Sequence, residues 1–327
     1  MRYVLEGSVR KGGNRVRITA QLIEAETGTH LWADRFDGSL EDVFDLQAKV
    51  AASVAGVIEP ALQVNEIRRS GERPTADLTA YDFYLRALSV MFRLEKEDLV
   101  EAANLLDQAI ARDPRFGPAL AFASICHLRL VEDGWAADSE TGKQTAIRLA
   151  HRALEVARND PTVLANAAFT LARLGEEITT MIALIDRALS LNPSYARGWS
   201  LSGMVHLWAG QPDLAIEHVE RSLRLAPGDY FGNRVNIIGM AHFLAGRDEE
   251  AAYNFRLAIR EAQGAAWMYR FLAASCAYLG RREEAREVIN QLRTTGAPVM
   301  PTGTSVANRE LRERMVAGLR LAMGETA

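Results

Sequence analysis

The segment Gly142-Lys143-Gln144-Thr145 contains residue types that hold nucleotide phosphates. A phosphate-binding loop needs the pattern G-x4-G-K-[ST] between a strand and a helix, so that backbone N–H groups and the lysine surround the phosphates. Here Ala137 stands where the first glycine belongs, Gln144 follows the lysine, and the flanks have helical patterns. We therefore expect no nucleotide site, and we interpret an insertion around Val131–Gly142 as a long loop between helices.

Metal, acid–base or nucleophilic chemistry would need clustered histidines, cysteines, serines or carboxylates. His206 and His242 hold equivalent positions in successive repeats, but equivalent helices lie about 8–10 Å apart, too far for both rings to reach one zinc at about 2 Å. Acid pairs such as Glu283-Glu284 stand at helix starts, where they suit the helix dipole. Cys126 and Cys276 lie in apolar helices and are expected to be buried free thiols. No catalytic, cofactor-binding or metal-binding residue is predicted.

The best functional candidates are aromatic, methionine, amide and arginine side chains on the first helix of each predicted helix pair. They are expected to be exposed on a concave surface, where they suit an extended peptide or a partner helix. The alternative is that Trp208, Phe243 and Trp267 pack between repeats, because aromatic residues at helical spacing usually belong to a core. The candidate set is Asn166, Arg173, Met204, Trp208, Asn236, Met240, Phe243, Trp267, Arg270 and Tyr278, with Thr170, Ser200, Leu207 and Asn233 beside them.

A 34-residue rhythm indicates the elements that would carry these side chains. Ala251 and Ala285 are 34 positions apart, and so are Pro193 and Pro227. A period near 34, with a tryptophan, a glycine, a small alanine and a closing proline at fixed offsets, resembles the tetratricopeptide repeat. The resemblance implies antiparallel helix pairs that stack into a superhelix and leave a concave surface lined by the first helices.

Glycine and alanine at these offsets allow close helix packing. Gly203 is expected to let the first helix approach its partner, and Ala215 does the same from the second helix. Weaker copies of the pattern extend upstream, which gives about six units, more than the minimum of three for a stable stack. Glycines just past a helix end, which favour a left-handed cap, mark the turns at Gly210, Gly246 and Gly280.

The expected fold class is therefore mainly α, with a superhelix of about six helix pairs over residues 79–295. A loop and a final helix occupy residues 296–327. In that helix apolar side chains recur at every fourth position, which is typical of an amphipathic helix. We expect it to cap the open end of the stack. The recurring residues are Leu311, Met315, Leu319 and Met323.

Composition excludes several classes of partner. The 327 residues carry a formal charge of −4, and the clusters Arg68-Arg69 and Arg281-Arg282 are short and lie beside acids. Nucleic-acid binding needs many Lys and Arg contacts on one face, so we do not expect it. No apolar run approaches the roughly 18 residues of a membrane span, and the first residues lack the apolar segment of a signal peptide. A cytoplasmic setting is expected, and the oligomeric state is left open.

Residues 1–60 have a different pattern. Tyr3–Arg10, Arg15–Leu22 and Thr29–Phe36 are predicted strands, and in the second strand apolar and polar residues alternate. A helix follows a capping-box pattern at Ser39 and Asp42, and residues 61–78 form a polar linker. Three strands and one helix make a thin sheet with a bare edge. Our hypothesis is that this α+β block is incomplete, that Met1 is not the natural start of the ancestral domain, and that a further α/β portion once preceded it.

The N-terminal residues also resemble a known family. The run YVLEGSVRKGGNRVRITAQLIEAETGTHLWADRFDGSLEDVFDLQAKVA is similar to the end of the TolB-like (FlgO-like) α/β domain of bacterial multidomain regulators. In that family the segment is followed by tetratricopeptide repeats, as here, and is often preceded by a class III adenylate/guanylate cyclase domain or a winged-helix DNA-binding domain. A cyclase needs two metal-binding aspartates within that upstream domain, so no residue here inherits a catalytic role.

The resemblance implies a non-catalytic protein–protein interaction scaffold, the regulatory tail of a cyclase-type signalling protein. Its concave face, from Asn166 to Tyr278, would bind a peptide or a partner domain. One alternative is a fragment of an adenylate cyclase whose catalytic domain lies upstream, and a weaker one is a regulator with an upstream winged helix. A clamp for two carboxylates needs a Lys/Asn/Lys/Arg set, and no lysine pair is present to form it.

Overall fold

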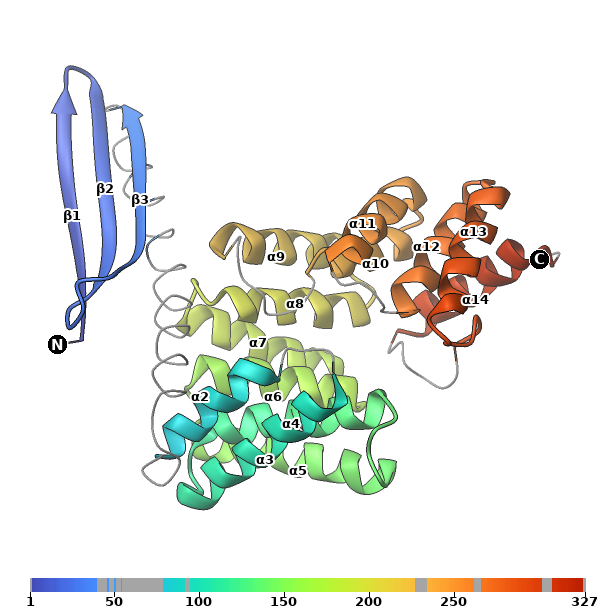
Figure 1. Ribbon diagram of the computed structural model, residues 1–327, viewed down its shortest axis with the longest axis horizontal. Coiled ribbons are helices and arrows are strands. Elements are labelled where there is room, and N and C mark those ends of the chain that lie inside the picture. The colour runs from blue at the N-terminus through green and yellow to red at the C-terminus, as the bar shows by residue number, and fades with distance from the viewer. Residues whose placement is uncertain are drawn as a thin grey trace.

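The computed structural model contains a three-stranded sheet followed by a series of paired helices (Figure 1). The sheet and the helices are built from separate stretches of the chain. The described residues are 2–39, 79–91, 95–226, 234–261, 266–301 and 308–325, together with Leu46, Val50 and Val54.

The sheet is antiparallel, with the strand order β1 (Tyr3–Gly12), β2 (Arg15–Glu24) and β3 (His30–Ser39). In the register of β1 and β2, Gly7 lies opposite Ala20, and a tight turn with Gly13 at φ 61° joins the two strands. The left-handed conformation of this turn residue favours glycine. The three strands predicted from the alternating pattern are present.

One face of the sheet is apolar and partly covered. Val16, Ala20 and Phe36 are buried together with Leu46, and Val50 and Val54 pack against them. Leu46, Val50 and Val54 are helical, but the rest of the helix predicted there and the 61–78 linker lie outside the described residues. On the edge strand β1, in contrast, Leu5 and Val9 are 50% and 69% exposed. The apolar face of the sheet thus extends to β1, beyond the part that Leu46, Val50 and Val54 cover.

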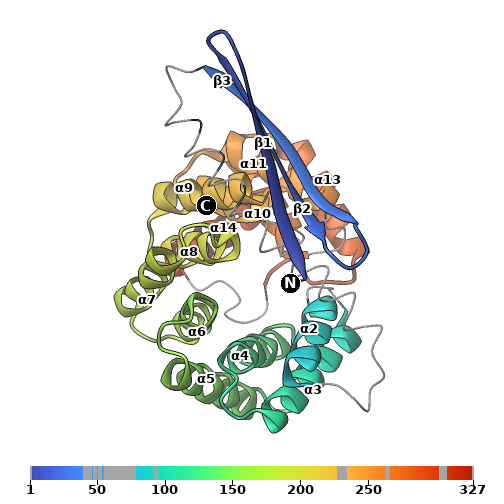
Figure 2. The ribbon, with the colours of Figure 1, turned by 90° about the vertical axis from the view of Figure 1, so that its left-hand side faces the viewer.

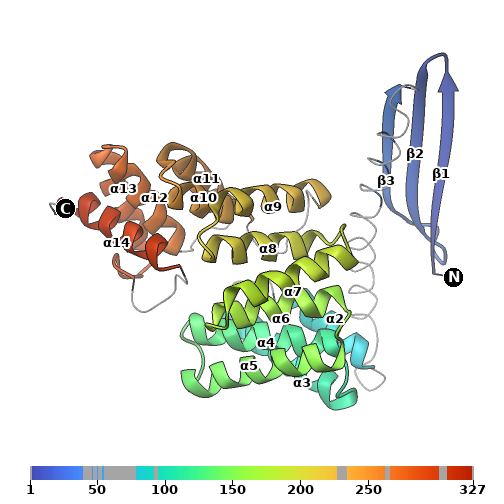
Figure 3. The ribbon, with the colours of Figure 1, turned by 180° about the vertical axis from the view of Figure 1, so that it is seen from behind.

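Among the described residues from 79 onward, the helices form six consecutive pairs and one additional helix, as the repeat pattern predicts. Within a pair the two helices pack against each other, and each pair packs on the next (Figures 1 and 3). The helices are α2 (Ala80–Val90), α3 (Lys96–Arg112), α4 (Gly117–Glu132), α5 (Ser139–Val156), α6 (Pro161–Arg173), α7 (Ile178–Leu191), α8 (Ala196–Trp208), α9 (Pro212–Leu225), α10 (Arg234–Leu244), α11 (Asp248–Glu261), α12 (Ala266–Tyr278), α13 (Arg282–Thr294) and α14 (Arg309–Met323).

The turn inside each of the last three pairs has the same geometry. Gly210, Gly246 and Gly280 adopt φ values of 75°, 74° and 73°. After each glycine, the next N–H donates to a carbonyl five residues earlier, as in the bond from Gln211 to His206 at 2.9 Å. This left-handed cap ends the first helix and reverses the chain, as expected from the glycine positions.

Small residues bring the helices of a pair into contact. At Gly203 in α8, a Cβ atom would lie 2.5 Å from Cγ2 of Val219 and 2.9 Å from the carbonyl oxygen of Ala215, both in α9. Repetition of this packing curves the array, and Figure 2 shows α4, α6 and α8 on its inner side and α5, α7 and α9 on its outer side. The first helices therefore line the concave face.

The insertion between α4 and α5 is shorter than expected. Helix α4 continues to Glu132 and α5 begins at Ser139, so Gly142-Lys143-Gln144-Thr145 is helical rather than part of a loop. The side chain of Asp138 caps this helix by accepting a bond from the N–H of Glu140 at 3.0 Å. The prediction of a long loop over Val131–Gly142 is wrong because this N-cap starts the helix early.

Candidate functional site

A row of polar and aromatic side chains crosses the first helices of three successive repeats. Phe169 of α6 and Trp208 of α8 have ring centroids 5.1 Å apart, and the guanidinium of Arg173 lies 5.7 Å from the Trp208 ring. Arg173 also pairs with Glu132 at the end of α4, at 2.5 Å. All four side chains come from first helices, so this concave row joins repeats two, three and four. It contains the predicted site residues Arg173 and Trp208.

Asn166 and Thr170 are buried, and their predicted exposure is wrong. The Asn166 amide donates to the carbonyl of Thr162 at 2.7 Å and to the Tyr195 hydroxyl at 3.2 Å. Its oxygen accepts from Arg197 Nε at 3.0 Å. Because α6 lies between α4 and α8, a side chain at this position bridges to the next repeat instead of facing solvent. Asn166 thus supports packing rather than a partner site.

The final helix α14 covers the concave side of the last two repeats. It packs chiefly against α12 and touches α10 and α13 lightly. Earlier first helices behave differently, because α10 and α12 contact the second helix of the preceding repeat more than its first helix. The expectation that this helix caps the open end of the stack stays a prediction. In the structure the apolar side of α14 lies on the first helices, chiefly on α12 of the last repeat.

This placement buries predicted site residues under the chain's own C-terminal segment. Phe243 and Tyr278 face the guanidinium of Arg314 at 4.3 and 4.1 Å from their ring centroids. Arg270 donates to the carbonyls of Val299 at 3.1 Å and Pro298 at 2.8 Å. Phe243 and Met240 are buried, and the remaining members of the predicted set are half-buried, namely Met204, Asn236 and Trp267.

A histidine pair inside the fourth repeat was missed at the sequence level. The rings of His206 and His218 are 4.8 Å apart, and His218 Nδ1 is hydrogen-bonded to Ser202 Oγ at 2.9 Å. Spacing along the chain relates His206 to His242 of the next repeat, whereas the fold places it beside His218 on the second helix of its own repeat. The Gln211 side chain holds His206 at 2.6 Å.

Lowering the pH is expected to destabilise the fold through His218. Burial, followed by the nearby His206, lowers the pKa of His218 below its ordinary value, and burial does the same for His242 and His127. The unfolded chain then binds more protons as pH falls through about 6.5, so stability is lost in that range and levels off below the folded pKa. Melting temperatures at pH 7.5 and 5.5 should differ less in His218→Gln than in the wild type; an equal difference would contradict this.

The two cysteine thiols are expected to be unreactive at neutral pH. Both are free and buried, and burial raises the pKa of Cys126 to about 12 and that of Cys276 to about 11. A thiol with such a pKa stays protonated and is a poor nucleophile at neutral pH. Within the described part of the chain, no group of three His, Cys, Asp or Glu side chains could hold a metal ion.

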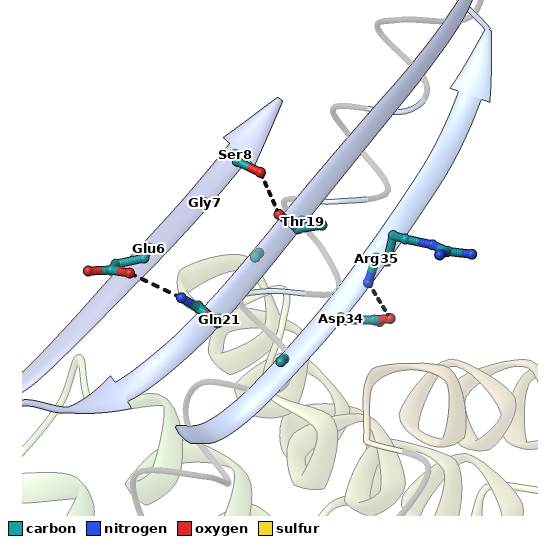
Figure 4. Close-up of a pocket in the computed structure, with 9 residues that line it drawn as sticks. Glu6, Gly7, Ser8, Thr19, Gln21, Asp34 and Arg35 are labelled. Atoms are coloured by element: carbon teal, nitrogen blue, oxygen red, sulfur yellow. Dashed lines mark hydrogen bonds between the residues drawn. The ribbon is translucent and has the colours of Figure 1, made fainter. Parts of the chain in front are cut away.

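A shallow hollow of about 680 Å³ lies on the open face of the sheet (Figure 4). Its side chains pair with one another across the strands, as in the bond from Ser8 to Thr19 at 2.7 Å and that from Gln21 to Glu6 at 3.0 Å. Such cross-strand pairs stabilise an exposed sheet face. These four side chains are thus engaged with one another. Among the helices that are described, none is both long and apolar enough to span a membrane.

Comparison with known proteins identifies one relative by sequence and several solved structures with a similar helical arrangement. No protein-family model matches the chain. "Putative adenylate cyclase 3" of Rhizobium meliloti (strain 1021) is 34% identical over 179 residues, which is 54% of this chain and only 30% of that protein. The chain thus spans less than a third of that relative.

Two solved structures share the helical arrangement. Human IFIT1, solved as a dimer with m7Gppp-AAAA, is 16% identical and covers 68% of this chain and 52% of that chain, with a TM-score of 0.56. PilW, a type IV pilus biogenesis factor, is 20% identical and covers 66% of this chain and 92% of that chain, with a TM-score of 0.50. At these identities the likeness concerns the fold. The chain has six helix pairs among its described residues, glycine turns that repeat, and these structural neighbours. Together they show that the helical part of the chain has the tetratricopeptide-repeat fold.

Proposed function

We propose that this chain is a non-catalytic interaction scaffold and a regulatory part of a cyclase-type signalling protein in the cytoplasm. The repeat fold supports the scaffold role, because such arrays present an extended surface to partners. The relative named as an adenylate cyclase supports the cyclase connection, and it favours that connection over a winged-helix regulator. The cyclase activity itself would reside in a part of the native protein outside these repeats.

The observation that carries the binding role is the concave row of Phe169, Arg173 and Trp208. Trp208 is half-buried, so its ring is held by Phe169 and still meets solvent. Tryptophan and arginine are the residue types that dominate protein interfaces, because they combine a large apolar area with a polar group. A peptide or a partner domain with an apolar anchor fits this row.

A protein partner is favoured over RNA. The IFIT1 structure was solved with a capped RNA fragment, so the fold can hold RNA in that protein. The present chain has a formal charge of −4, and the arginine of the concave row is already paired with Glu132. Phosphate binding needs several unneutralised cations on one face. The row therefore suits a peptide better than a nucleic-acid backbone.

Replacing Trp208 with alanine is expected to weaken partner binding by about 30-fold, the equivalent of about 2 kcal/mol for an interface hot spot. The partner would be isolated from the host by affinity purification, identified by mass spectrometry and titrated against both proteins. Tyr253→Ala is the matched control, because Tyr253 is 62% exposed on α11, a second helix of the array. Equal affinity of the two variants, with helicity unchanged in circular dichroism, would contradict the site.

The cyclase connection is tested by the native product. An antibody against the repeats should detect a band well above 36.1 kDa in the host, the mass of this chain. The precipitated material should convert ATP to cyclic AMP. A band at 36.1 kDa without such activity would rule out the cyclase role and leave the scaffold role standing.

A further inference from the structure

The contact between α14 and the repeats, called the seam below, is apolar and closely packed. Leu311, Met315 and Leu319 of α14 are at most 1% exposed and belong to one cluster with Phe271 and its neighbours. At Gly318 the approach is closest, since a Cβ atom there would lie 2.6 Å from the Cβ of Ala274. Such a close contact between Gly318 of α14 and Ala274 of α12 requires the surfaces of the two helices to be complementary in shape.

A polar anchor in the middle of the seam holds one arginine. Asp248 accepts both hydrogen bonds of a bidentate pair from Arg314, at 3.0 and 2.7 Å. The guanidinium lies against Phe243 and Tyr278, and the two charged side chains are 21% and 10% exposed. The three partners of Arg314 come from α10, α11 and α12, so the repeats themselves build a guanidinium pocket. Bidentate pairing and aromatic stacking make it specific for arginine over lysine.

Two further bonds align the helix along the array. The Tyr278 hydroxyl donates to the carbonyl of Arg314 at 2.9 Å, and the Asn308 amide donates to the carbonyl of Trp208 at 3.2 Å. The second bond joins the start of α14 to the end of α8, next to the concave row. The surface on α10 and α12 and the concave row are therefore continuous.

The connection of α14 to the array differs from that of the other helices. Helices α8 and α9 are joined by the three-residue turn Ala209–Gln211, whereas residues 295–308 separate α13 from α14. The position of α14 is consequently determined by its contacts with the surface and not by a tight turn. A segment of the same chain acts on such a site at an effective concentration on the order of millimolar.

We propose that the surface of α10 and α12, with the Arg314 pocket, is a helix-binding site that α14 occupies within its own chain. The partner it fits is an amphipathic helix with one arginine among Leu and Met side chains spaced four apart, which binds by displacing α14. This inference rests on the proposed scaffold function and names the class of partner for one part of its concave face. Binding of the partner would then be coupled to release of α14, because α14 must leave the site before the partner helix can bind.

The test uses a fluorescent peptide of residues 308–325 and the full-length chain. Gly318→Leu should release α14 without altering the surface beneath it, because the substitution lies on α14 itself. This variant is expected to bind the peptide at least about tenfold more tightly than the wild type, whose site is filled by a tethered competitor. Ala317→Leu is the matched control, because it adds a leucine at the exposed neighbouring position and should bind like the wild type. An Arg314→Ala peptide should bind the released chain at least about tenfold more weakly.

The outcomes separate this inference from the proposed function. If Gly318→Leu binds no more peptide than Ala317→Leu, α14 is an ordinary packed helix and the inference is overturned. Circular dichroism establishes that the variant is folded, and Arg314→Ala in the full-length chain replaces it in the same assay if it is not. Capture of a partner through Trp208 would be unaffected by a negative peptide result. Loss of that capture would likewise leave the peptide result intact.

Discussion

Replacing Phe255 with alanine should lower the free energy of unfolding by about 3–5 kcal/mol, the range for large aromatic side chains in a core. Phe255 is fully buried on α11, and its ring stacks on Phe271 at a centroid distance of 5.3 Å and an angle of 10°. Its ring also fills the space beside Gly239, where a Cβ atom would lie 3.1 Å away. Ala251 and Ala252 already hold the backbones close together, so the cavity cannot collapse. Urea unfolding followed by circular dichroism measures the loss.

The damage from Phe255→Ala should be local. In an array of stacked repeats each unit contacts only its neighbours, so stability is close to a sum over units. Hydrogen exchange should therefore rise in α10–α13 much more than in α2–α5. Tyr253→Ala, two residues away on the same helix and largely exposed, should change stability by less than about 0.5 kcal/mol. Similar losses of stability for both variants would contradict the assignment of Phe255 to the buried face of α11 and of Tyr253 to its exposed face.

The features that could be predicted from sequence are local ones. The left-handed caps at Gly210, Gly246 and Gly280 are made by a few consecutive residues, so the residue type and its spacing suffice to predict them. The same holds for the alternation in β2, where a period of two separates the buried Val16 and Ala20 from neighbours that are exposed or half-buried. Six helix pairs follow because the 34-residue period is repeated along the chain.

The features that could not be predicted depend on long-range packing. Periodicity indicates that α14 is amphipathic, but not which surface receives its apolar side. The bond from Asn308 to Trp208 joins residues that are 100 positions apart, and no spacing rule relates them. Asn166 is predicted to be exposed because the repeat register places it on the concave side of a first helix. In the structure, however, Tyr195 and Arg197 of the next repeat bond to its amide. The chain's own C-terminal segment thus covers part of the concave surface that periodicity assigned to a partner.

Substituting Gly203 with leucine is the most direct test of the repeat register, and should cost about 1–3 kcal/mol by overpacking. A Cβ atom alone would lie 2.5 Å from Cγ2 of Val219, which can rotate, and 2.9 Å from the backbone oxygen of Ala215, which cannot. Leucine adds three more carbons in the same place, so α8 and α9 must move apart. Their separation also disturbs Trp208 at the end of α8 and hence the concave row.

The comparison that decides this prediction is Ala111→Leu on α3. Ala111 is exposed, so a leucine there adds similar bulk to a helix without entering an interface. The two melting temperatures should differ by a few degrees, since about 1 kcal/mol corresponds to roughly 1–2 °C in a protein of 327 residues. Equal melting would mean that α8 and α9 do not meet at Gly203, and the pairing assigned to every later repeat would fail with it. A selective loss in Gly203→Leu would instead show that α8 and α9 pack closely at this glycine, which is the packing that holds the end of α8, with Trp208, in place.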